Sequence, residues 1–98
     1  MKIVAVTACP TGIAHTYMAA AQLEKTAKKL GHTIKVETQG AMGIENELSQ
    51  GDVDAADAVI FATDIAIEKE ERFARARTIL VPVQAALKDP EAIFAQLK

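Results

Sequence analysis

Hydrophobic and polar positions follow two different periods along the chain, and their alternation predicts an α/β fold. Short runs of β-branched and apolar residues predict strands at residues 2–8, 33–38, 58–63 and 78–83. After the first run, apolar residues recur every three or four positions and predict a helix over residues 15–30, which Gly31 ends. Strands that alternate with helices in this way indicate a parallel sheet.

Two further helical segments are expected. One covers residues 44–49, and Asp52 is expected to cap a brief turn before the third strand. Asp89 followed by Pro90 is typical of a helix start, because the acid can accept a capping hydrogen bond and proline needs no N–H there. Right-handed crossovers then place helices on both faces of a four-stranded parallel sheet with strand order 2-1-3-4. We therefore expect a single three-layer domain over residues 1–98.

The carboxyl ends of the strands are the expected place for a site, since ligands of such sheets bind there. Cys9 follows the first strand, Gln39 and Gly40 follow the second, and Asp64 follows the third. Asp64 is a candidate general acid or, alternatively, a turn or cap residue. Arg72 lies further along the third connection and is a candidate contact for an anion or for a partner's carboxylate.

Cys9 is the only cysteine, and it lies between the first strand and the predicted helix. A helix N-terminus presents unpaired N–H groups and a partial positive charge, which favour a thiolate or a phosphoryl group. Gly12 lets the backbone approach an oxyanion, while Thr11 and Thr16 add hydroxyl donors. The alternative is a buried, inert cysteine. The candidate phosphate-binding loop after Cys9 comprises Pro10, Thr11, Gly12, Ile13, Ala14, His15 and Thr16.

Composition narrows the functional classes. The 98 residues are 50% hydrophobic, which suffices for one core, and a single cysteine cannot form an internal disulfide. A net charge of −2 and 4% aromatic residues argue against a nucleic-acid surface. Without a signal peptide or a long apolar stretch, we expect a cytoplasmic chain that does not insert into a membrane. No phosphate-loop, dinucleotide or metal-ligand spacing occurs, so no metal and no other cofactor is expected.

Residues 6–20 resemble the phosphorylation-site loop of fructose-type IIB components of the bacterial phosphoenolpyruvate-dependent sugar phosphotransferase system. Further matching blocks lie at residues 35–40, 43–48, 57–60 and 71–73. The chain departs from the family pattern at residues 74–77, where a Gly-Lys pair is common.

The resemblance implies a phosphotransferase. Cys9 would accept a phosphoryl group from a phosphohistidine on a IIA component and pass it to a sugar, fructose or a fructose-like one, bound by a membrane IIC component. Such a protein works in the cytoplasm, at the inner face of the membrane through IIC, and needs no metal or nucleotide.

Two other functions remain open from the residues alone. Low-molecular-weight tyrosine phosphatases use a similar cysteine loop on a similar sheet, with arginine at the position of His15. Replacing a guanidinium by an imidazole weakens transition-state stabilisation, which disfavours hydrolysis. A non-catalytic, anion-binding regulatory module would use the same loop only as a phosphate cradle.

Overall fold

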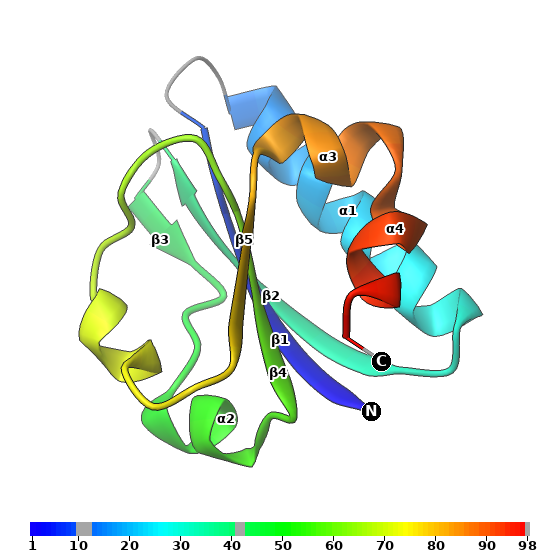
Figure 1. Cartoon of the computed structure of the whole chain (residues 1–98). Coiled ribbons are helices and arrows are strands. Elements are labelled where there is room, and N and C mark those ends of the chain that lie inside the picture. Colours follow the sequence, from blue (N-terminus) through cyan, green and yellow to red (C-terminus); the bar gives the residue numbers. More distant parts are fainter. Residues whose placement is uncertain (10–12, 41–42, 98) are drawn as a thin grey trace.

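The computed structural model describes residues 1–9, 13–40 and 43–97 (Figure 1). The strands are β1 (Lys2–Ala8), β2 (Thr33–Gly40), β3 (Gly43–Glu45), β4 (Ala58–Thr63) and β5 (Thr78–Val81). The helices are α1 (Ile13–Lys29), α2 (Gln50–Ala55), α3 (Val83–Lys88), α4 (Pro90–Ala95) and the 3₁₀ helix η1 (Glu70–Phe73).

In this part of the chain, five strands form one sheet in the order β3-β2-β1-β4-β5. β1, β2, β4 and β5 run parallel, and their order confirms the predicted arrangement. The predicted strand count was wrong, because β3 pairs antiparallel with the end of β2. A three-residue strand is too short to show a hydrophobic period in the sequence.

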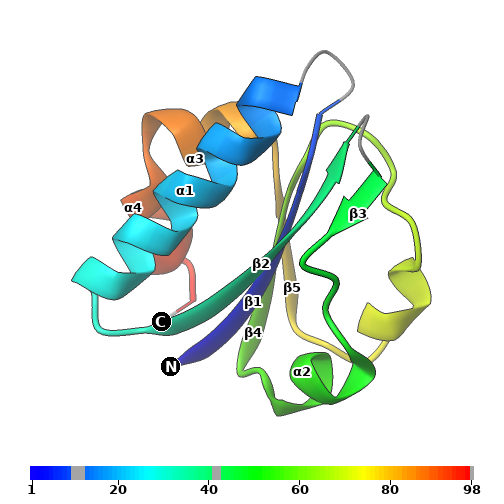
Figure 2. The ribbon, with the colours of Figure 1, turned by 180° about the vertical axis from the view of Figure 1, so that it is seen from behind.

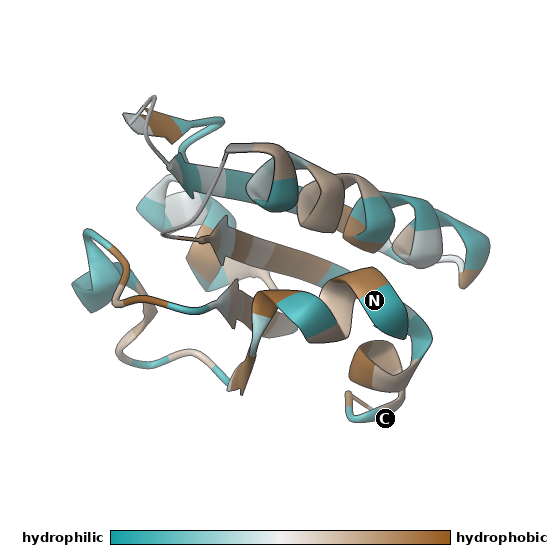
Figure 3. Ribbon diagram, turned by 90° about the horizontal axis from the view of Figure 1, so that it is seen from above, coloured by the Kyte–Doolittle hydropathy of each residue, from teal (hydrophilic) through white to brown (hydrophobic). Residues whose placement is uncertain are grey.

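Helices cover both faces of the sheet, which confirms the three-layer prediction. α1, α3 and α4 lie on one face, and α2 and η1 lie on the other (Figures 1 and 2). The middle strand is hydrophobic along most of its length, whereas the helices alternate between hydrophilic and hydrophobic residues (Figure 3). A strand buried on both faces needs such a continuous apolar run.

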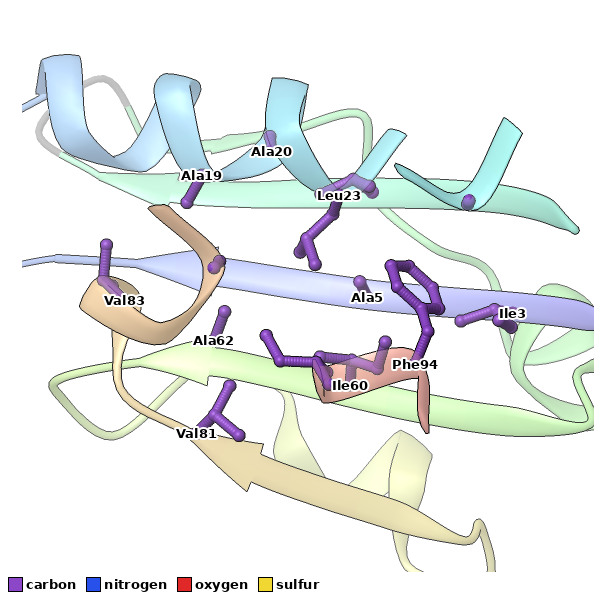
Figure 4. Close-up of a cluster of buried hydrophobic side chains, with 14 of the residues drawn as sticks. Ile3, Ala5, Ala19, Ala20, Leu23, Ile60, Ala62, Val81, Val83 and Phe94 are labelled. Atoms are coloured by element: carbon purple, nitrogen blue, oxygen red, sulfur yellow. The ribbon is translucent and has the colours of Figure 1, made fainter. Parts of the chain in front are cut away.

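β1 divides the core into two clusters, because its side chains alternate between the faces. Ile3 and Ala5 point toward α1 and α4 and pack there with Leu23 and Phe94 (Figure 4). On the opposite face the buried cluster consists of Val4, Val6, Leu48, Val53, Val59, Phe61 and Phe73.

α1 begins two residues before the predicted start and ends at Lys29, just before Gly31, the residue predicted to stop it. This glycine has a φ of 81°, a left-handed conformation that residues with a Cβ rarely adopt. His32 N–H donates to Ala27 O at 2.8 Å and Gly31 N–H donates to Lys28 O at 3.2 Å, which is a Schellman motif. Like every other helix in the described residues, α1 is not long and apolar enough to cross a membrane.

The helix predicted at residues 44–49 is wrong, because β3 takes up part of that stretch and the helix begins at Gln50. Ser49 is the N-cap: its side chain accepts from Asp52 N at 3.0 Å, and Asp52 Oδ2 accepts from Ser49 N at 3.0 Å. Asp52 is therefore the third helical residue of a capping box and not the cap of a separate turn.

The strand predicted over residues 78–83 is too long, because β5 ends at Val81 and α3 begins at Val83. Pro82 between them provides no N–H and ends the strand. The predicted start of the last helix is confirmed. Asp89 caps α4 by accepting from Ala92 N at 3.3 Å, and Pro90 is the first helical residue.

Candidate active site

Cys9 lies directly after β1, at the end of the sheet where the parallel strands finish. Its side chain is 7% exposed and packs in the hydrophobic cluster on the α1 face. α1 begins at Ile13, which confirms that the cysteine lies between a buried strand and a helix N-terminus. Pro10, Thr11 and Gly12 of the candidate loop lie outside the described residues, as does the side chain of Ile13.

The first turn of α1 supplies the rest of the candidate loop. Ala14 and His15 are exposed, whereas Thr16 is 2% exposed. The Thr16 carbonyl accepts a 3.1 Å hydrogen bond from Thr7 Oγ1, which ties this turn to β1. Thr16 Oγ1 itself is buried and has no hydrogen-bond partner among the described residues. The turn thus combines the positive end of the helix dipole with a hydroxyl that no described residue uses.

The neighbours of β1 confirm that the three predicted connections meet at one edge. Ala8, just before Cys9, lies opposite Gln39 of β2 and opposite Thr63 of β4. Asp64 N–H donates to Ala8 O at 3.1 Å, so the segment after β4 begins beside the cysteine. β2 extends to Gly40, two residues beyond the predicted end, so Gln39 and Gly40 belong to this strand and do not follow it.

Asp64 serves as a helix cap in this structure. Its Oδ1 accepts a 3.1 Å hydrogen bond from Val83 N, at the start of α3. The residue at the N-cap position of α3 is Pro82, whose side chain makes no capping bond. Asp64 therefore provides the missing acceptor from a neighbouring segment, which favours the cap interpretation over that of a general acid.

Arg72 is engaged with protein acceptors through all five of its N–H donors. Nη1 and Nη2 pair with the two carboxylate oxygens of Glu37 at 2.7 and 3.0 Å. The remaining bonds go to main-chain carbonyls: Nε to Lys69 O at 2.8 Å, Nη1 to Leu48 O at 2.7 Å, and Nη2 to Glu68 O at 3.4 Å.

This ion pair lies away from the cysteine. Glu37 is opposite Val6, three residues before Cys9, and Val6 belongs to the cluster on the α2 face. Cys9 packs on the α1 face instead. The structure therefore does not bring Arg72 to Cys9 as an anion contact, and the guanidinium holds a buried carboxylate instead.

Glu37 is completely buried, and its neighbours keep it ionised. Burial raises the pKa of Glu37, but hydrogen bonds from Arg72, Gln39 and the Leu48 N–H outweigh that effect and hold the pKa below its usual value. The hydrogen bond to Glu37 in turn raises the pKa of Arg72, against the opposing effect of burial.

Sequence reasoning missed Glu37. A charged residue in a strand is normally exposed, and its partner Arg72 lies 35 residues further along the chain. No local pattern connects the two positions, so the pair becomes visible only in the folded structure.

Other ionisable side chains form surface pairs. Lys69 contacts Glu47 at 2.7 Å and Lys35 contacts Asp52 at 3.0 Å, with both lysine side chains more than half exposed. Such pairs contribute little to stability. In residues 1–9, 13–40 and 43–97, no group of three His, Cys, Asp or Glu side chains is placed to hold a metal ion.

One model of a known protein family covers most of the chain. The model of the family described as "PTS system, Lactose/Cellobiose specific IIB subunit" matches residues 4–96. The chain belongs to the IIB family of the sugar phosphotransferase system. IIB components are phosphotransferases, so the expected class of enzyme is confirmed.

Individual relatives of this IIB chain carry fructose in their names. It is 53% identical over 97 residues to the PTS system fructose-like EIIB component 2 of Escherichia coli K12, covering 99% of this chain and 92% of the relative. It is 50% identical over 99 residues to the fructose-like PTS system EIIBC component of the same organism, covering 99% of this chain but 20% of the relative.

Solved structures agree with this assignment. A domain of the fructose-specific IIABC component from Borrelia burgdorferi has a TM-score of 0.93 and 48% identity to this chain, covering 98% of the chain and 91% of the domain. The predicted fructose-like IIB family and α/β fold are therefore confirmed.

Proposed function

We propose that this IIB chain carries a phosphoryl group on Cys9, between a phosphohistidine of a IIA component and a sugar bound by a membrane IIC component. The observation that carries the proposal is the position of Cys9, between the end of buried strand β1 and the start of α1. Unpaired N–H groups and the helix dipole at such a position favour a bound phosphoryl group.

The two transfers balance without a further reactant. In the first, the Cys9 thiolate attacks phosphorus; the S–P bond forms while the N–P bond breaks, and the donor imidazole leaves. In the second, a sugar hydroxyl attacks phosphorus; the O–P bond forms, the S–P bond breaks and Cys9 returns to the thiolate. The hydroxyl proton passes to a base or to water. The chain contributes the nucleophile and the hydrogen-bond donors that hold the phosphoryl oxygens.

Transfer is favoured over hydrolysis by two side chains. His15 lies in the first turn of α1, where a phosphatase of similar loop would carry arginine, and an imidazole offers less stabilisation to the transferring group than a bidentate guanidinium. Asp64, the candidate general acid, is occupied as the cap of α3. Both features suit a carrier that must keep its phosphoryl group until the sugar arrives.

The names of the relatives support a choice of sugar and of partners. We propose fructose or a fructose-like sugar, because the relatives at 53% and 50% identity are named fructose-like. A IIC partner is supported by the EIIBC relative, and a IIA partner by the IIABC protein that contains the matching solved domain. The chain would then act in the cytoplasm, at the inner face of the membrane through IIC.

Incubation with a phosphorylated IIA component tests the proposal. We expect one phosphoryl group to appear on Cys9 by peptide mass spectrometry, and neither Cys9→Ser nor Cys9→Ala to acquire it. Thermal unfolding of both variants should match the parent, which shows that the fold is intact.

Three results would contradict the proposal. A Cys9→Ser variant that accepts phosphate at the parental rate would exclude Cys9 as the carrier. Turnover of aryl phosphates by the chain alone would identify a hydrolase. Sugar uptake that persists in Cys9→Ala would instead identify an anion-binding module.

A further inference from the structure

The side chain of Gln39 holds the segment that follows β4. Its Nε2 donates to Glu68 O at 3.1 Å, and its Oε1 accepts from Glu68 N at 2.7 Å. Gln39 is 6% exposed and both bonds are partly buried, although Glu68 itself is exposed. A side-chain amide can satisfy the donor and the acceptor of one residue's main chain at once, which a carboxylate or a hydrocarbon cannot.

Glu37 determines which way this amide faces. Gln39 Nε2 also donates to Glu37 Oε2 at 2.6 Å, and an ionised carboxylate can only accept hydrogen bonds. The amide oxygen must therefore face Glu68 N–H. Glu37 itself is fixed by the two bonds from Arg72 and by Leu48 N–H at 2.8 Å.

Residues 64–69 are thereby held at both ends; we call them the rim segment. At its start, Asp64 bonds to Ala8 O and to Val83 N. At its end, Gln39 holds Glu68, and Arg72 Nε donates to Lys69 O at 2.8 Å. Figure 1 shows that this segment leaves β4 at the same end of the sheet at which β1 finishes.

The Gln39–Glu68 hydrogen bonds connect segments on opposite sides of β1, the strand that Cys9 follows. Gln39 belongs to β2 and the rim segment follows β4, while β1 lies between them in the sheet. Ala8, the register partner of Gln39, directly precedes Cys9. The Gln39 side chain thus links the strand on one side of β1 to the segment that follows the strand on its other side.

We propose that Gln39 is a positioning residue for phosphoryl transfer, which keeps in one place the rim segment that begins beside Cys9. The inference rests on the proposed function. Because the segment begins beside the residue that precedes Cys9, we infer that a donor domain bringing its phosphohistidine to Cys9 passes this segment. If the segment were not held, docking would have to order it first, and that entropic cost would appear in the KM for the donor.

The test measures transfer from phosphorylated IIA to the full chain at several donor concentrations. Gln39→Met keeps the length of the side chain but removes its hydrogen bonds. We expect the KM for the donor to rise roughly tenfold, with kcat and the alkylation rate of Cys9 within about twofold of the parent. The matched control is Gln50→Met. Gln50 Nε2 also donates to a main-chain carbonyl, Arg72 O at 2.9 Å, and to Asp54 Oδ1 at 3.0 Å, both outside the rim segment. The KM of Gln50→Met for the donor should equal that of the parent.

The outcomes separate this inference from the proposed function. A parent chain that accepts no phosphoryl group would overturn the proposed function itself. An active parent with an unchanged KM in Gln39→Met would overturn only the positioning role. Parallel losses of kcat and of Cys9 alkylation would also overturn it, because the residue would then act on the cysteine loop.

A second measurement needs no variant. Hydrogen exchange of the parent should show the Glu68 amide protected well above its exposed neighbours Ile65 and Ala66, because Gln39 accepts its hydrogen bond. Equal exchange rates at these three positions would overturn the inference.

Discussion

The buried polar side chains near the end of β1 differ in their hydrogen bonding. Glu37 and Gln39 have several partners each, whereas Thr16 Oγ1 and Thr38 Oγ1 have none among the described residues. A buried hydroxyl without a partner lowers stability, and it is retained where a ligand uses it. Because Thr16 also lies in the first turn of the helix that follows Cys9, we propose it as a donor to a phosphoryl group on Cys9.

Replacement of Thr16 by valine should separate stability from transfer. We expect Thr16→Val to leave the free energy of unfolding unchanged or to raise it by up to about 1 kcal/mol, because no hydrogen bond is lost. Transfer to Cys9 should fall on the order of a hundredfold, as for other removed oxyanion donors. Denaturant unfolding and transfer rates check both effects.

Thr7→Val is the matched control, since Thr7 Oγ1 does donate, to Thr16 O at 3.1 Å. It should lose about 1 kcal/mol of stability. If Thr16→Val were the more destabilised variant and still transferred at the parental rate, the assignment of Thr16 would be wrong.

The sequence predicted the structural positions of some single residues but not of others. The position of Cys9 between a strand and a helix, and the Asp89 cap, could be predicted because strands, helix starts and caps each have local signals. Glu37 could not, because its burial depends on Arg72, which reaches it only after the chain has folded.

At the scale of elements, length decided what the sequence predicted correctly. β1, β4 and the 17-residue helix α1 each carry enough residues to show a period. The three-residue β3 and the six-residue α2 do not, and their bounds depend on pairing with β2 and on the capping box at Ser49. The ends of elements were better predicted by motifs with a characteristic residue, such as Gly31 after α1, than by the hydrophobic pattern.

The capping box of α2 should stabilise this helix measurably. Hydrogen bonds from Ser49 N, from Lys35 and from the Ser49 side chain lower the pKa of Asp52 to about 2. Because this value lies below that of the unfolded chain, about 3.9, the contribution is complete above about pH 4 and is lost as the pH falls toward 2. We expect Ser49→Ala to cost about 1 kcal/mol of stability at neutral pH and to raise the pKa of Asp52.

Carboxyl titration by NMR and denaturant unfolding measure these effects. Ser49→Thr is the control, since threonine retains the capping oxygen and should stay close to the parent. An Asp52 pKa that stays at about 2 in Ser49→Ala, together with unchanged stability, would show that the cap does not act as described.

For the whole molecule, the buried ion pair of Glu37 with Arg72 connects β2 to η1 across the α2 face. Removing one partner should lower the free energy of unfolding strongly, because the charge of the other partner would remain buried without a counter-ion. We expect Arg72→Met to lower the free energy of unfolding by about 3–5 kcal/mol at neutral pH, and the double variant Glu37→Met with Arg72→Met to lose less.

The pH dependence of this loss has a definite sign. The pKa of Glu37 is held below its usual value, so the pair stabilises the parent above about pH 4.3 and its contribution declines as the pH falls through the folded value. In Arg72→Met, the buried Glu37 carboxylate has no guanidinium partner, so burial raises its pKa. Protonation at low pH then removes the unpaired buried charge. Denaturant unfolding at several pH values should show that the difference in free energy of unfolding between the parent and Arg72→Met becomes smaller as the pH falls. A constant difference would contradict this account of the pair.

The central claim, that this IIB chain stores a phosphoryl group on Cys9 for a sugar, is tested most directly by phosphorus NMR of the phosphorylated chain. We predict that the cysteine phosphoryl signal persists without IIC and moves to a sugar phosphate when IIC membranes and fructose or a fructose-like sugar are added. Decay to inorganic phosphate at the same rate with and without these partners would contradict the claim.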